Sequence, residues 1–313
     1  MENIILEHTK NYNSALSQYY ITMNKRIMRE LFKNLTRSHV SVKKMLREKN
    51  IRGFISHPVL KDLSFLNSKF VPIEIKKTME TEIHYTLKYS FKINTRKITI
   101  LFYIHSYDEI QIKKYDGYIE KIMILLFFLS TYSKNKCSNH LTIHFCLSSL
   151  QKLIPTNVID VFDVKHVNSA VTTSCVPKGH IFIYRNEEWF KVLIHELFHV
   201  MGLDFSYGHS SLFTQKLRDE LNIESDYLIY EAYSEFWATI INTMFYTYFT
   251  LYFDTKVDNI YIDDFLDMNN QHLNIELTFS LLQSVKILSY MHLNYEMCLE
   301  TAGKISKFCR WTP

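Results

Sequence analysis

The chain has 313 residues, 47% of them hydrophobic, and a formal net charge of +4 at pH 7. This length and apolar content suffice for one large domain or two modest ones, which excludes a disordered or fibrous protein. The mild positive charge permits a nucleic-acid partner but does not demand one.

Helical spacing of apolar residues from Tyr12 to Lys49 predicts that a long helix or a helix pair opens the chain. The stretches 82–94 and 96–106 then alternate apolar and polar side chains around Asn94-Thr95, which predicts an antiparallel hairpin. A helix over about 115–132 and a strand over about 140–147 should follow.

The segment HIFIYR at 180–185 alternates like a strand, and a helical pattern, NEEWFKVLIHELFHVMG, follows it at once. We expect Asn186 to cap that helix and Gly202 to end it. Three further helices are predicted, over about 211–221, from about 227 through the aromatic stretch that follows, and over about 272–290.

These elements predict an α+β fold, with a mixed or antiparallel sheet followed by a mostly helical C-terminal part. We expect three segments: a helical 1–55, a sheet-containing 56–205 that ends in the HELFH helix, and a helical 206–313. The uncharged stretch 236–253 carries an asparagine, threonines and tyrosines, so we expect a core helix there and no membrane span.

The cysteines are scattered without the spacing of a disulfide framework, and we therefore expect free thiols in a reducing compartment. The first ten residues, MENIILEHTK, lack the basic and apolar regions of a secretory signal. The sequence thus predicts an intracellular, cytoplasmic protein. The five cysteines are Cys137, Cys146, Cys175, Cys298 and Cys309.

The sequence HELFH has the form of a metal-binding motif. On a helix, residues four apart project from one face, so His195 and His199 can direct two imidazoles at one ion. Glu196 lies beside them, where it can accept a proton from metal-activated water. Buried imidazoles and a carboxylate without partners would cost several kcal/mol, so the apolar surroundings favour an ion over two structural histidines.

A catalytic zinc needs a third protein ligand. The long motif HExxHxxGxxH would place that ligand at 205, but the residue there is Phe205. Asp204 and His209 are candidates in the loop that follows. Glu231 and Glu235, four apart on one face of a predicted helix, are the others.

The arrangement resembles the gluzincin metallopeptidases, in which HExxH on one helix is completed by a glutamate on a later helix. The resemblance implies a zincin-like fold, Zn²⁺ as cofactor, Glu231 as third ligand and Glu235 as the acid that orients His195. Glutamate replaces the more usual aspartate at the second place, which leaves the two roles exchangeable. The stretch 166–242 also resembles uncharacterised metallopeptidase-like proteins of nucleocytoplasmic large DNA viruses, through IHELFH, GLDFS and EAYSEFWA.

The predicted function is therefore that of a zinc metallopeptidase with Glu196 as general base, acting on a peptide or protein in the cytoplasm, which for a viral protein means the host cytoplasm or the virion. We expect HIFIYR to be an edge strand that pairs with an extended substrate. Tyr230, Tyr233, Tyr207 and His209 are candidates for stabilising the oxyanion.

Two alternatives stay open. A zinc hydrolase could act on something other than peptides, since ligands alone do not define a substrate. A catalytically inactive zincin-fold protein could instead bind nucleic acid or protein through its basic N-terminal helix. That segment, 25–52, has ten lysines and arginines against two glutamates.

Overall fold

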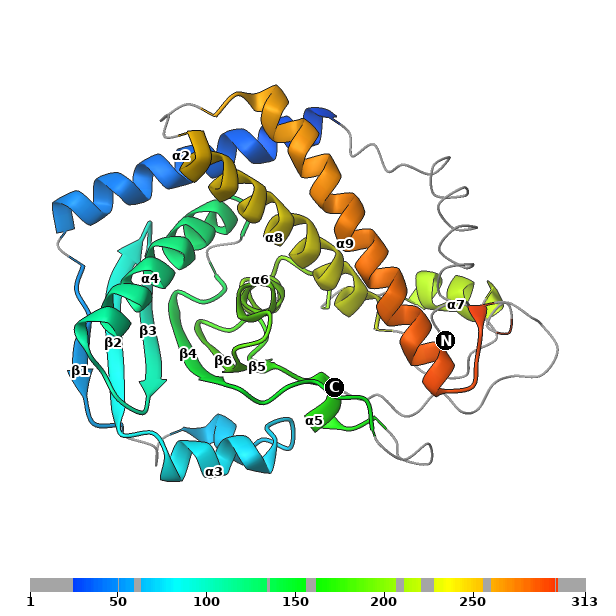
Figure 1. Cartoon of the computed structure of the whole chain (residues 1–313), viewed down its shortest axis with the longest axis horizontal. Coiled ribbons are helices and arrows are strands. Elements are labelled where there is room, and N and C mark those ends of the chain that lie inside the picture. Colours follow the sequence, from blue (N-terminus) through cyan, green and yellow to red (C-terminus); the bar gives the residue numbers. More distant parts are fainter. Residues whose placement is uncertain are drawn as a thin grey trace. The chain divides into compact units, whose positions relative to one another are not determined.

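A computed structural model describes most of the chain (Figure 1). Its internal contacts divide the chain into two compact units. Of the described residues, one unit takes those from 25 to 34 and from 243 to 294, and the other takes those from 35 to 242 together with 295 and 297. The division into three segments remains a prediction. The described residues are 25–49, 51–58, 63–133, 136–155, 162–206, 211–220, 228–255, 260–295 and 297.

A mixed six-stranded sheet with the order β1-β2-β3-β4-β6-β5 forms the centre of the second unit. β1, β2 and β3 are antiparallel neighbours, β4 is parallel to both β3 and β6, and β5 is antiparallel to β6. The strands are β1 (Phe54–Ser56), β2 (Tyr85–Ile93), β3 (Arg96–Ile104), β4 (His140–Ser148), β5 (Ala170–Thr172) and β6 (Lys178–Arg185).

The predicted hairpin is confirmed as β2 and β3, and Asn94 between them has a φ of 51°. Asparagine tolerates this left-handed conformation, which a two-residue hairpin turn requires. The predicted strands at 140–147 and 180–185 are also confirmed, as β4 and β6. The prediction that HIFIYR is an edge strand is wrong, because β6 pairs with β4 on one side and with β5 on the other.

The structure confirms the predicted α+β class, and its last three helices make the C-terminal part mostly helical. The opening helix is confirmed over α2, although the prediction for residues 12–24 lies outside the described residues. α4 and α9 begin earlier than predicted. The helices are α2 (Lys25–Lys49), η2 (Ser64–Asn67), α3 (Ile73–Thr81), α4 (Glu109–Ser130), α5 (Val164–Val167), α6 (Trp189–Val200), α7 (Ser211–Glu220), α8 (Ile229–Thr255) and α9 (Ile262–Tyr290).

The two faces of the sheet are covered by different helices. α3 lies against one face, and α4 and α6 lie on the other (Figure 1). On the α3 face, Ile75 and Met79 pack with Tyr103, Phe182 and Tyr184. Because strand side chains alternate in direction, the intervening apolar residues of β3, β4 and β6 are buried beneath α4 and α6.

α6, the helix with the HELFH motif, is separated from β6 by three residues. Arg185 at the end of β6 is buried and donates to the carbonyl oxygens of Asn168, Leu150 and Lys165, which fixes this end of the strand. The predicted cap at Asn186 is wrong. Its amide still pairs with the carbonyl of Ser148, as a continuation of the sheet, and the helix begins only at Trp189.

In the first unit, the uncharged stretch of α8 packs in part through polar contacts. The hydroxyl of Thr247 lies 2.8 Å from Nδ1 of His272 and 3.3 Å from Oδ1 of Asn269, both on α9. Phe32 of α2 packs on Phe265 of α9 with 4.6 Å between ring centroids. Across the described part of the chain, no helix has the length and apolarity of a membrane span.

Candidate metal centre

His195 and His199 lie one helical turn apart on α6, and their rings converge. Their Nε2 atoms are 3.1 Å apart. α6 is apolar nearly all round, with Leu193, Ile194 and Leu197 fully buried, so the helix is held in the core of its unit. This packing fixes the direction in which the two imidazoles project.

Glu231, in the first turn of α8, completes a group of three. Its Oε2 lies 3.0 Å from Nε2 of His195 and 3.3 Å from Nε2 of His199. Zinc bonds of about 2.0–2.2 Å at tetrahedral angles separate ligand atoms by roughly 3.3 Å. The three measured separations match that requirement, so His195, His199 and Glu231 could hold a metal ion.

Two other carboxylates approach the histidines from the Nδ1 side. Nδ1 of His199 donates to Oδ2 of Asp204 at 2.6 Å, and the Asp204 side chain is fully buried. Oε2 of Glu235 lies 3.3 Å from Nδ1 of His195, too poorly aligned for a good hydrogen bond but facing an otherwise unpaired buried nitrogen. In a neutral imidazole a proton on Nδ1 leaves the lone pair on Nε2, where a metal binds.

The two Nε2 atoms and the Glu231 carboxylate can lie this close together only if positive charge lies between them. With both Nδ1 atoms protonated, two Nε2 lone pairs and the Glu231 carboxylate would face one another at 3.0–3.3 Å. Either extra protons or a metal cation must lie among them. The donor set of two imidazoles and one carboxylate fits zinc, which takes nitrogen and oxygen ligands of this kind.

The pKa values of the metal-free centre reflect the same charges. Burial lowers the pKa of His195, but Glu231 and Glu235 outweigh it and raise that pKa to about 10. In the same way, Asp204 and Glu231 overcome burial and raise the pKa of His199 to about 9. Burial raises the pKa of Glu231, but the two histidines outweigh it and lower that pKa to about 2.

Glu196 lies beside His195 on α6 and is half-buried. Burial raises the pKa of its carboxyl group, the nearby charge of Glu231 adds to that rise, and the two histidines oppose it. A carboxyl group whose pKa is moved toward neutrality is a stronger base for proton transfer near pH 7.

Two residues of the site were not predicted from the sequence. Nζ of Lys191 lies 2.6 Å from Oε1 of Glu235, so the carboxylate beside Nδ1 of His195 is itself paired with a cation. Ser206 donates to Oδ1 of Asp204 at 3.0 Å. Lys191 could have been found from its spacing, four residues before His195 on the same helical face. Ser206 offers no such signal, because its loop follows no regular period.

The remaining predicted residues lie around this group or outside the described chain. Phe205 is partly exposed and packs on Tyr233 with 5.1 Å between ring centroids. The Tyr230 ring lies 6.1 Å from that of His199, and its pKa is raised by burial and by Glu231 and Asp204. Tyr207 and His209 lie outside the described residues.

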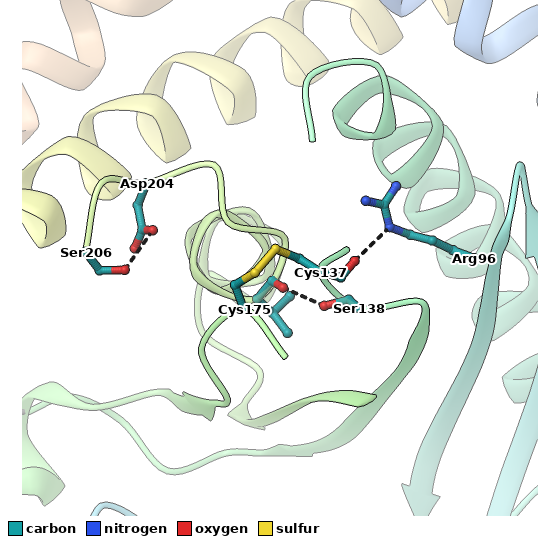
Figure 2. The surroundings of a disulfide bond; sticks show 7 residues. Arg96, Cys137, Ser138, Cys175, Asp204 and Ser206 are labelled. Carbon is teal, nitrogen blue, oxygen red and sulfur yellow. Dashed lines mark hydrogen bonds between the residues drawn. A yellow bond between two sulfur atoms is a disulfide. The ribbon is translucent and has the colours of Figure 1, made fainter. Parts of the chain in front are cut away.

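The expectation of free thiols is wrong for Cys137 and Cys175, which form a disulfide beneath α6 (Figure 2). The physical reason lies in the parallel pairing of β4 and β6. His140 of β4 pairs with Lys178 of β6, and Cys137 and Cys175 each precede one of these paired residues by three positions. The two segments that lead into β4 and β6 therefore lie side by side. Cys146 is free and buried, and Cys298 and Cys309 lie outside the described residues.

A comparison of the chain with known protein families, with curated proteins and with solved structures finds no match. The arrangement of the site therefore has to carry any statement about function.

Proposed function

We propose that this protein is a zinc-dependent metallopeptidase of the gluzincin type. One observation carries the proposal: Nε2 of His195, Nε2 of His199 and Oε2 of Glu231 converge within 3.0–3.3 Å of one another. The three atoms come from two helices separated in sequence, as the HExxH motif with a later glutamate requires.

In this proposal Glu231 is the third ligand, and Glu235 and Asp204 are outer acids. Lys191 supports the assignment of Glu235, because the ion pair at 2.6 Å directs one carboxylate oxygen away from the histidine. Asp204 contacts Nδ1 of His199, on the opposite side of the ring from the Nε2 atom of the group of three. Both acids would hold their imidazole in the orientation and tautomer that binds a metal.

A zinc ion in this position supplies Lewis-acid activation of a water molecule and of a carbonyl group. Glu196 would accept a proton from the attacking water and pass it to the leaving amine nitrogen. The raised pKa of the Glu196 carboxyl supports this role. Tyr230, next to the ligand glutamate and near His199, is the described candidate for a hydrogen bond to the developing oxyanion.

Among the residues that the structure describes, the strand with a free edge beside α6 is β5, which ends the sheet order next to β6. β5 is antiparallel to β6, and α6 contacts both strands. We propose that an extended peptide pairs with β5, rather than with HIFIYR, because only an edge strand has unpaired backbone groups to offer.

The alternative of an inactive binding protein depends on the basic charge of α2, and ion pairs reduce that charge. Lys43, for example, lies 2.9 Å from Glu120. The nucleic-acid interpretation is therefore weaker than the enzyme interpretation, which accounts for the three acids that lie against the two histidines. Other pairs on α2 are Arg29–Asp263, Lys33–Glu30 and Lys44–Glu48.

The test combines metal analysis with cleavage of a mixed peptide library by the purified chain. We expect one zinc per chain at the centre and cleavage that falls by a factor of about 10²–10⁴ in Glu196→Gln, because the general base is lost. Glu196→Gln should keep its zinc, since Glu196 is not a ligand. A chain that binds no zinc, or a Glu196→Gln variant that cleaves at the original rate, would refute the proposal.

A further inference from the structure

The disulfide between Cys137 and Cys175 lies against the turn that follows the HELFH helix. Cys137 is buried in the loop before β4, and Cys175 is half-buried in the loop before β6. The Cys137 loop is anchored on both sides, because Nε of Arg96 donates to the Cys137 carbonyl and the Ser138 hydroxyl donates to the carbonyl of Val200 (Figure 2). The crosslink is therefore tied directly to the last turn of α6.

Gly202 is the point of closest approach between the turn and the crosslink. A Cβ atom on Gly202 would lie 2.8 Å from Sγ of Cys137 and 3.3 Å from Sγ of Cys175, closer than packed atoms tolerate. Gly202 also has a φ of +64°, the left-handed conformation that a glycine adopts readily. Both the close sulfur atoms and the positive φ therefore disfavour any side chain at position 202.

The turn leads directly to the metal centre. The amide of Gly202 donates to the carbonyl of His199 at 3.1 Å, and the amide of Leu203 donates to that of Phe198 at 2.8 Å, the pattern that ends a helix at a left-handed glycine. Two residues after Gly202, Asp204 accepts from Nδ1 of His199 at 2.6 Å. The geometry of the turn thus decides where the Asp204 carboxylate lies.

We propose that the Cys137–Cys175 disulfide is a positioning element of the metal centre: it braces the Gly202 turn, holds Asp204 on His199 and makes metal affinity sensitive to dithiol reductants. The inference rests on the proposed function, because it needs His199 to be a metal ligand. It assigns a role to a crosslink that takes no part in catalysis.

The redox step follows ordinary thiol–disulfide exchange. The thiolate of a dithiol attacks Sγ of the half-buried Cys175, forms a mixed disulfide and releases Cys137 as a thiolate, which takes up a proton. The second thiol of the reagent then displaces Cys175, leaving two cysteine thiols and an oxidised dithiol. Reduction removes the bond that holds both sulfur atoms against Gly202, so the Gly202 turn loses this brace.

The experiment measures zinc affinity by competition with a colorimetric chelator. The full chain is compared before reduction, after reduction and removal of the dithiol, and after reoxidation. We expect affinity to fall by about tenfold or more on reduction, the scale at which loss of an outer partner of a ligand acts, and to return on reoxidation. Cys137→Ser/Cys175→Ser should have the low affinity throughout, which also excludes zinc bound by the new thiols.

Two variants test whether reduction of the disulfide changes zinc affinity through Asp204. Cys146→Ala removes a buried thiol away from the turn and should respond to reduction as the unmodified chain does. In Asp204→Asn the outer acid is already lost, so reduction should change zinc affinity by less than about twofold if the disulfide acts through Asp204.

The outcomes separate this inference from the proposed function. If the oxidised chain binds no zinc, both are overturned. If it binds zinc equally well after reduction, or if reduction weakens Asp204→Asn as much as the unmodified chain, only the positioning role of the disulfide is overturned.

Discussion

Among the neighbouring histidines described in the second unit, the pair on α6 and a pair on the sheet have opposite surroundings. His195 and His199 on α6 are approached by Glu231, Glu235 and Asp204. His144 and His180 lie on β4 and β6, with Nε2 of His144 3.5 Å from Nδ1 of His180.

The sheet pair has hydrogen-bonding and aromatic neighbours instead of acids. The hydroxyl of Tyr103 lies 2.9 Å from Nδ1 of His144, and the ring of Phe65 packs on the same imidazole. Burial, together with His180, lowers the pKa of His144 to about 3, whereas acids raise the pKa of His199 to about 9 despite burial. Two close histidines thus form a neutral contact or a candidate metal centre according to the carboxylates beside them.

Among the substitutions that test this comparison, replacement of the proposed ligand Glu231 should have the largest effect on zinc affinity. Glu231→Gln leaves the two imidazoles without their anionic partner, and we expect zinc affinity to fall by more than about hundredfold. His180→Gln in the sheet pair is the matched control and should leave zinc affinity unchanged. Equilibrium dialysis with zinc measures both, and equal losses in the two variants would contradict the distinction drawn between the pairs.

The outer acids should have the next largest effect. Asp204→Asn keeps the size of the side chain but removes its charge, and we expect zinc affinity to fall by about 10–100-fold. Glu235→Gln should act in the same direction but less strongly, because Glu235 is half exposed and lies 3.3 Å from its histidine rather than 2.6 Å. Isothermal titration with zinc gives both values; a larger loss in Glu235→Gln would point to Glu235 as the ligand.

The pH dependence of stability sharpens the comparison further. In chelator-treated protein, the pKa of His199 is raised to about 9. The stability that protonated His199 contributes to the fold is therefore complete below the unfolded pKa near 6.5 and is lost as pH rises toward 9. The pKa of His144 is lowered to about 3. The stability that neutral His144 contributes to the fold is therefore complete above pH 6.5 and is lost as pH falls toward 3.

The melting temperature of chelator-treated variants measures these contributions. His199→Gln should flatten the alkaline fall between pH 7 and 9, and His144→Gln should flatten the acid fall between pH 6.5 and 5, each by about a few degrees. Glu231 has a pKa of about 2, so its carboxylate loses its contribution to stability at a lower pH than this interval of 6.5 to 5. Variants that flatten the opposite limbs would show that the electrostatic assignment of the two pairs is reversed.

The smallest effect is expected at Lys191, which acts on the site only through Glu235. Lys191→Met removes the cation from Glu235, and we expect zinc affinity to change by less than about tenfold, since Glu235 keeps its place on α8. Lys191→Arg should restore the original affinity. A loss as large as that of Glu231→Gln would show that Lys191 has a more direct role in the metal centre.

Patterns of short range could be read from the sequence, because they depend on neighbours along the chain. The hairpin at Asn94, the helix that ends at Gly202 and the four-residue spacing of His195 and His199 all follow from local periodicity. The start of α9 could not be read in this way. Its first turns, IDDFLDMNNQ, are polar, and only packing shows that Phe265 and Asn269 are buried.

The sequence by itself determined that two imidazoles share one face of an apolar helix and that few carboxylates could join them. Only the tertiary structure shows which of these acids lies beside both Nε2 atoms, because the distance from α6 to Glu231, Glu235 or Asp204 depends on how separate segments pack. The same holds for Cys137 and Cys175, which are 38 residues apart. Parallel pairing of β4 and β6 brings them together, and the local pattern of either strand does not show which strand it pairs with.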